Sequence, residues 1–311
     1  MSRGAALTGA LLVTLALPAT WPMALAAFLI RGGLLIVALP ILVLPTPVGL
    51  GNILAPTLTT VVFGGVSAEF ILVLSTIVLA ALVWVVAGGL FAAALEAEAA
   101  RMVAAAHDVA AAGMAGGLAP RVLRRGRAEA GQILAARLLA DLPLGVALAW
   151  GSARLIAVTY RELTNPFDVA SPLVWRVLGG SPEVVVAVVL TWMVGQTVGA
   201  VAARRIALGG LGIFDALGEA LSTVLRRPLV VTADFWLPSL ALALALAPSA
   251  LAAASAAHVV RAAISSPVDP VGLGLAVVLF VGLWLVGLAL TGLICAWRAA
   301  VWTVGFGGCS R

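Results

Sequence analysis

Hydrophobic side chains run in long stretches along this chain, and most polar residues gather in the connections between them. A helix needs ~20 mainly apolar residues to cross ~30 Å of hydrocarbon, and six stretches meet that test. The pattern therefore predicts an all-α, polytopic membrane bundle that forms a single transmembrane domain over residues 1–311. The predicted spans are 23–44, 70–95, 138–158, 184–203, 235–257 and 271–297.

Composition excludes a water-soluble fold. Of the 311 residues, 63% are hydrophobic and 10% are charged, whereas soluble domains carry ~25% charged residues. All 18 basic residues are arginine, which indicates a GC-rich bacterial genome. The net charge is +5, but no basic stripe typical of a nucleic-acid interface is present. Cys295 and Cys309 stand in neither a CxxC pair nor a histidine cluster, which argues against metal or redox chemistry.

The arginines predict how the chain is threaded. They concentrate in two connections, 96–137 and 204–234, and loops rich in arginine stay on the cytoplasmic side of a membrane. Six spans then place both termini in the cytoplasm, which predicts a multi-pass protein of the bacterial inner membrane. The arginines predicted to lie at the membrane surface are Arg121, Arg124, Arg125, Arg127, Arg204, Arg205, Arg226 and Arg227.

The first residues allow two interpretations. Arg3, the apolar stretch 5–17 and the small residues of 24–26 are typical of a signal peptide with its cleavage site. Hydrophobicity that continues to residue 44 favours the other interpretation, a short interfacial helix over 1–22 joined to the first span. Pro18 and Pro22 would then mark the break between them.

The second arginine-rich connection carries a helical pattern of its own. Apolar residues fall on one face and polar residues on the opposite face at 100° per residue. Such an amphipathic elbow lies along an anionic inner leaflet or packs under the bundle. The first connection is alanine-rich, and each elbow is followed by a Leu-Pro pair, which points to a parallel internal duplication. The apolar face holds Phe214, Leu217, Leu221, Val224 and Leu225, and the polar face holds Asp215, Glu219, Ser222 and Arg226.

Two segments carry a resemblance to a known group of proteins. ILAARLLADLPL (133–144) and GLGIFDALGEALSTVLRRP (210–228) resemble segments of bacterial six-span proteins of the glycerophosphoryl diester phosphodiesterase membrane-domain type. Gly212, Ala216 and Leu217 fit the Gly-x-x-x-Ala-Leu pattern of that group, and Arg227 and Pro228 fit its re-entry pair. The resemblance covers about 70–257 and implies a six-span fold of uncharacterised function. The phosphodiesterase domain of some members has no room in this chain, so no catalytic residue carries over.

Arg31 is the most informative single residue, because it lies ~12 Å along the first predicted span. A charge at that depth costs a few kcal/mol unless it is paired or hydrated. Gly32 and Gly33 follow, so the helix can open a cavity as discontinuous transporter helices do. Alternatively, Arg31 snorkels to the interface. Asp141 and Asp234, at the inner ends of two spans, pair either with local arginines or with Arg31, and these three residues form the predicted substrate site.

The remaining motifs indicate packing rather than chemistry. Gly195 and Gly199 form a GxxxG pair, which is typical of close contact within a bundle or between subunits. A metal cluster is not convincing among Glu96, Glu98, His107 and Asp108, because no second histidine lies nearby. No phosphate loop, nucleophile elbow or zinc motif occurs. We therefore expect no enzyme activity, no cofactor and no metal.

These features predict a non-enzymatic scaffold, accessory subunit or lipid-interacting component of the membrane. Its expected partners are the bilayer, anionic inner-leaflet lipids and either another membrane protein or a second copy. The alternative is a transporter or permease subunit that takes an anionic or lipid-like substrate near Arg31. The third hypothesis is an intramembrane enzyme that processes lipids.

Overall fold

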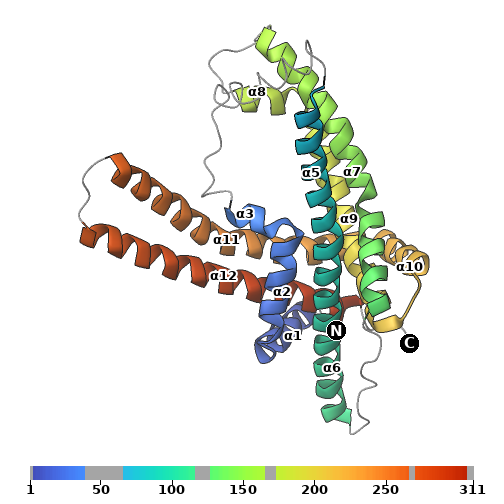
Figure 1. Ribbon diagram of the computed structural model, residues 1–311. Coiled ribbons are helices and arrows are strands. Elements are labelled where there is room, and N and C mark those ends of the chain that lie inside the picture. The colour runs from blue at the N-terminus through green and yellow to red at the C-terminus, as the bar shows by residue number, and fades with distance from the viewer. Residues whose placement is uncertain (1–2, 39–65, 116–126, 165–172, 266–269, 307–311) are drawn as a thin grey trace. The chain divides into compact units, whose positions relative to one another are not determined.

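The computed structural model describes residues 3–38, 66–115, 127–164, 173–265 and 270–306 (Figure 1). All regular elements in these ranges are helical, which confirms the all-α prediction. The elements are α1 (Arg3–Ala16), α2 (Thr20–Phe28), the π-helical η1 (Leu29–Gly33), α3 (Leu34–Ala38), α5 (Ala68–Val83), the π-helical η2 (Trp84–Gly88), α6 (Gly89–Ala115), α7 (Arg127–Thr164), α8 (Leu173–Gly179), α9 (Pro182–Gly209), α10 (Ile213–Arg226), α11 (Pro228–Ser265) and α12 (Pro270–Phe306).

Six helices in the described ranges are long and apolar enough to cross a membrane, as predicted. They extend beyond most of the predicted spans, because helical backbone continues into the polar flanks where hydrophobicity has already ended. The chain is thus a multi-pass membrane protein by the length and composition of its helices. The six candidate spans are Thr20–Val37, Ala68–His107, Glu129–Glu162, Pro182–Gly209, Pro228–Ala256 and Gly274–Gly305.

The chain divides into two compact units, and several long helices contribute residues to both. The first unit comprises Met1–Ala16, Ala97–Ser239 and Trp297–Arg311. The second comprises Leu17–Glu96 and Leu240–Ala296.

Small residues bring α7 and α9 together in the first unit. A Cβ on Gly195 would lie 3.0 Å from the carbonyl oxygen of Ala140, and one on Gly151 would lie 2.7 Å from Cγ1 of Val184. Lipid gives helices no hydrophobic reason to associate, so close backbone approach and dispersion contacts hold them together. The C-terminal half of α9 is accordingly buried from Thr197 to Arg204.

The helix α10 is set off from its neighbours by two local stop signals. Gly210 ends α9 in the left-handed region, with φ of 66°, which glycine adopts without a Cβ penalty. Arg227 leaves helical geometry after α10, and Pro228 opens α11. Proline suits a first helical position because the N–H that it lacks would be unpaired there. Residues Ile213–Arg226 therefore form a helix of their own between two candidate spans.

The first predicted elbow differs from the second in its described parts. Residues 97–115 continue α6, and residues 127–137 begin α7, so extensions of two spanning helices build this connection. An ion pair between Arg101 of α6 and Glu129 of α7 joins them. Arg121, Arg124 and Arg125 lie outside the described residues.

Pro143 also departs from its predicted place. The predicted span 138–158 puts Pro143 in its first turns, whereas α7 begins at Arg127 and encloses Pro143 in its interior. A proline there removes one backbone hydrogen bond and leaves the carbonyl of residue 139 without its helical donor. The helix continues through the proline to Thr164.

The N-terminal helix α1 packs within the first unit. Ala10 is fully buried in a cluster with Val103, Ala300 and Val301. The indole N–H of Trp297 donates to the carbonyl of Leu7 at 3.3 Å. These contacts fasten α1 to the ends of α6 and α12 that belong to the same unit.

Candidate functional site

The second unit contains a broken helix at the residue that the sequence singled out. The π-helical segment η1 joins α2 to α3, and Arg31 and Gly32 within it leave helical geometry. Gly32 has φ of 105°, a value that residues with a Cβ rarely adopt. The segment is therefore a kink between two helices, and such a kink changes the direction of the side chains on either side of it.

Arg31 is paired with an acid. Its Nη2 donates to Oε2 of Glu96 at 2.6 Å, and the two side chains are 31% and 8% exposed. Glu96 belongs to α6, far along the chain from η1. A charge inside a membrane protein is stable only when it is paired or hydrated, and this carboxylate supplies the pairing. The pair is the charged centre of the candidate site.

A second π-helical segment lies against the first. The indole N–H of Trp84, which opens η2, donates to the carbonyl of Ile30 at 3.0 Å. A Cβ on Gly88, which closes η2, would lie 3.0 Å from Cγ2 of Ile30. Trp84 of η2 thus caps the carbonyl of Ile30 beside the break in η1. Gly88 has no side chain, which leaves room for the side chain of Ile30.

A small cavity lies elsewhere in the second unit, between α3, α11 and α12. It has a volume of about 30 Å³, which is room for about one water molecule. No charged side chain lines it, so the cavity does not extend the Arg31 site. The lining residues are Ile36, Val37, Leu246, Ala250 and Trp284.

Asp141 and Asp234 lie in the first unit, whereas Arg31 lies in the second. Asp141 occupies the contact between α7 and α9, where its Oδ1 would be 2.6 Å from a Cβ on Gly195. Asp234 is buried near the start of α11. The carboxylate that the structure gives Arg31 is Glu96, a residue that the sequence analysis considered only as a weak metal ligand.

Gly195 and Gly199 both face α7. The aliphatic stem and the guanidinium of Arg137 lie 3.5 Å from the place where a Cβ on Gly199 would stand. The two glycines therefore let the charged side chains of α7 pass close to the backbone of α9. Their GxxxG spacing serves a contact within this chain in the described structure.

The elbow helix α10 has three faces rather than the two expected. Ala216 and Ala220 are fully buried, and they mark the face that packs on the bundle. Glu219 lies on the polar face and forms an ion pair with Arg205 of α9, with Nε and Oε2 separated by 3.3 Å. Phe214 and Leu225 are 79% and 71% exposed on the remaining face.

The eight arginines predicted at the membrane surface separate into groups. Arg204 is buried and donates from Nη1 to the carbonyl of Ala200 at 3.0 Å, and the Arg205 side chain is 12% exposed. These two therefore lie inside the bundle rather than at its surface, because their long side chains fold back along α9 and toward α10. Arg226 and Arg227 are exposed. Arg127 begins α7.

No group of three His, Cys, Asp or Glu side chains able to hold a metal occurs in the described ranges. Comparison with known proteins gives no further identification. No family model, curated protein or solved structure matches this chain.

Proposed function

We propose that this chain is a non-enzymatic, lipid-interacting membrane component that lies along the anionic leaflet of one membrane face through α10. One observation carries the proposal. The helix α10 is fastened to the bundle by Ala216 and Ala220 and by the Arg205–Glu219 ion pair, while Phe214, Leu221 and Leu225 face outward together. An exposed apolar stripe on a helix already held at the end of a span is suited to the boundary between headgroups and acyl chains.

The expected energies favour insertion of the stripe over simple charge attraction. Burying one large apolar side chain contributes ~1.5–3 kcal/mol, and one arginine near an anionic surface contributes ~1 kcal/mol. Three apolar side chains therefore outweigh Arg226 and Arg227, which lie exposed at the end of α10. The arginines then select an anionic leaflet for a helix that hydrophobicity already holds there.

The arrangement of the first unit supports the proposed orientation. The segment of α7 that carries Arg137 packs on the part of α9 that leads to α10, so both arginine-bearing connections belong to the same end of these helices. The positive-inside rule places that end in the cytoplasm of a bacterial cell. An even number of spans would then put both termini on the same side. The proposal does not require the internal duplication indicated by the Leu-Pro pairs.

Site-directed fluorescence tests this function in the full-length protein. Cys295 and Cys309 are replaced by serine, and a single cysteine is placed at Leu225 or, as the matched control, at exposed Asp215 on the polar face of α10. The labelled proteins are reconstituted in vesicles of phosphatidylcholine with phosphatidylglycerol. A quencher attached to the acyl chains should quench the label at 225 and spare the label at 215. Equal quenching of both labels by a water-soluble quencher would contradict the proposal.

A second candidate function rests on the Arg31–Glu96 pair at the helix break. A transporter or permease subunit for an anionic or lipid-like substrate uses such a discontinuous helix to expose a buried charge. Under this hypothesis, the anionic group of the substrate takes the place of the Glu96 carboxylate as the ion-pair partner of Arg31. Proteoliposomes loaded with labelled inorganic phosphate or fluorescent phosphatidylglycerol test it. Movement of either probe by the wild type, lost in folded Arg31→Leu protein, would support transport, and no movement of either by the wild type would exclude it for these substrates.

A further inference from the structure

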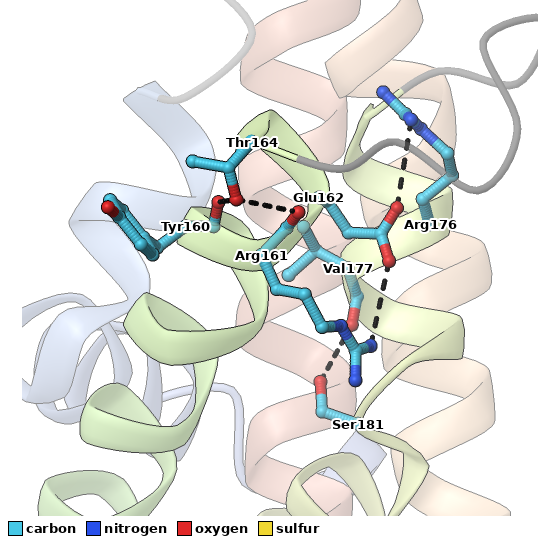
Figure 2. A network of polar contacts seen from close by, with 7 residues as sticks. All are labelled: Tyr160, Arg161, Glu162, Thr164, Arg176, Val177 and Ser181. Atoms are coloured by element: carbon cyan, nitrogen blue, oxygen red, sulfur yellow. Dashed lines mark hydrogen bonds and ion pairs between the residues drawn. The ribbon is translucent and has the colours of Figure 1, made fainter.

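A cluster of three charged residues lies at the end of the α7–α9 pair that is opposite α10. Arg161 and Glu162 stand in the last turn of α7, and Arg176 stands on α8 (Figure 2). Oε1 of Glu162 lies 3.5 Å from Nη2 of Arg161, and Oε2 lies 3.7 Å from Nη1 of Arg176. Figure 2 shows the two guanidinium groups on either side of the one carboxylate.

The cluster has more hydrogen-bond donors than its carboxylate can accept. Each guanidinium offers five N–H groups, and a carboxylate has about four acceptor positions. Nε and Nη1 of Arg176 are both buried and have no hydrogen-bond partner within the described part of the chain, and neither has Oε2 of Glu162, which lies 3.7 Å from Nη1. The three side chains together carry one net positive charge. Among the described residues, Arg154 and Glu183 form a separate ion pair, with Nε and Oε1 3.1 Å apart.

Packing fixes these groups in place. Glu162 is 8% exposed and Arg176 is 16% exposed, whereas Arg161 is 58% exposed. A Cβ on Gly180 would lie 3.2 Å from Nη2 of Arg161, so the absence of a side chain there makes room for the guanidinium. The half-buried Arg176 and the exposed Arg161 therefore offer donors from opposite sides of Glu162.

The length of α9 places the cluster at the depth of lipid headgroups. Its 28 residues extend ~42 Å, and a bilayer with its headgroup regions is ~40–45 Å thick. With α10 in one headgroup region, the beginning of α9 lies in the other. Tyr160 and Trp175 are exposed and directly precede Arg161 and Arg176, and such aromatic side chains favour the membrane interface.

We propose that the Arg161–Glu162–Arg176 cluster binds the phosphate group of a phospholipid in the leaflet opposite α10. Arginine matches phosphate with paired N–H donors, and charge-assisted hydrogen bonds of this kind are the strong ones. Glu162 holds the two guanidinium groups apart so that both can reach the same phosphate. This site goes beyond the proposed function, although its assignment to a leaflet rests on that function, because α10 sets the depth of the other end of α9.

Native mass spectrometry of the full-length protein in detergent tests the site. The probes are dioleoyl phosphatidylglycerol, dioleoylglycerol, which lacks phosphate, and inorganic phosphate at millimolar concentration. Wild-type protein should retain phosphatidylglycerol and not dioleoylglycerol. Arg161→Gln and Arg176→Gln should each weaken retention about tenfold. Arg154→Gln makes the same charge change on α7 outside the cluster and should leave retention unchanged.

Each remaining outcome also decides the question. Arg161 is largely exposed, so Arg161→Gln tests the site even where Arg176→Gln fails to fold, and Arg176→Lys should show partial loss because lysine keeps the charge without the paired donors. Equal retention by wild type, Arg161→Gln and Arg154→Gln would overturn the proposal. If the protein binds inorganic phosphate and does not retain phosphatidylglycerol, the ligand of the cluster is free phosphate and not a lipid headgroup. Arg226→Gln and Arg227→Gln change α10 and not the cluster, so both proteins should retain phosphatidylglycerol as the wild type does. This control distinguishes failure of the cluster from failure of the function proposed for α10.

Discussion

Trp84 caps Ile30: the indole N–H of one spanning helix donates to a backbone carbonyl, 3.0 Å away, at the break in another. The break itself follows from Gly32, whose positive φ interrupts the α-helical hydrogen bonds around it. In hydrocarbon an exposed carbonyl has no water to bind, so each freed group needs a partner from the protein. The two π-helical segments therefore depend on each other.

Replacing Trp84 with phenylalanine tests this dependence. An aromatic ring is kept and the donor is lost, so the carbonyl of Ile30 loses this hydrogen bond, at a cost of about 0.5–1.5 kcal/mol. We expect a lower midpoint of thermal unfolding in detergent. Trp150→Phe is the matched control, since Trp150 is similarly exposed and no hydrogen bond of its indole is described. Equal midpoints for the two variants would show that the cap contributes no stability.

Gly32→Ala should destabilise the protein by about 1–2 kcal/mol, because a Cβ disfavours its φ of 105° although the site has open space. Gly145→Ala makes the same change inside α7, also in open space. There alanine improves the helical preference, so stability should stay the same or rise by less than about 1 kcal/mol. Thermal unfolding of both variants measures the difference. A fall of the same size for both would mean that backbone geometry at Gly32 is not the cause.

The Arg31–Glu96 pair should appear as a coupling energy in a double-mutant cycle. Glu96→Leu leaves a guanidinium without this partner, and Arg31→Met leaves a buried carboxylate, so each single change should cost about 2 kcal/mol. This value is below that of a fully buried pair because Arg31 is 31% exposed. The double variant should recover most of the loss. Additive losses in the unfolding free energy would show that the two charges do not interact.

The contact between α7 and α9 should be sensitive to volume at Gly195. A valine there would collide with the carbonyl of Ala140 and with Asp141, at a cost of about 1–3 kcal/mol. Gly218→Val on α10 is the control, because nothing lies within 4 Å of its added Cβ. Crosslinking between cysteines on α7 and α9, together with unfolding, would report the separation of the helices. Unchanged crosslinking in Gly195→Val would contradict the packing role.

Sequence reasoning predicted the features that depend on local pattern. Long apolar runs gave six helices long enough to span, because the bilayer requires a fixed length of hydrophobic helix. The periodicity of 213–226 identified α10, since its polar and apolar positions alternate at the helical repeat. Neither prediction needs knowledge of which helices are neighbours.

The features that were missed depend on contacts between distant residues. Glu96 lies 65 residues from Arg31, and no local pattern connects them. Alanines are neutral in a hydrophobic pattern, so Ala216 and Ala220 gave no sign that a third face of α10 is buried. The sequence pattern also predicted Arg204 and Arg205 at the surface. Whether an arginine side chain is buried depends on the helix packed beside it, which the local pattern does not reveal.

If α10 and the arginine cluster lie at the two membrane surfaces as proposed, the fixed length of α9 makes the protein sensitive to membrane thickness. Gly210 leads directly into α10 at one end, and Pro182 begins the helix beside the arginine cluster at the other. A helix held at both surfaces cannot shorten, so a thinner bilayer must stretch its acyl chains around it or force the helix to tilt. Each ångström of mismatch costs a fraction of a kcal/mol. The chain would therefore partition toward membrane regions whose thickness matches this one rigid element.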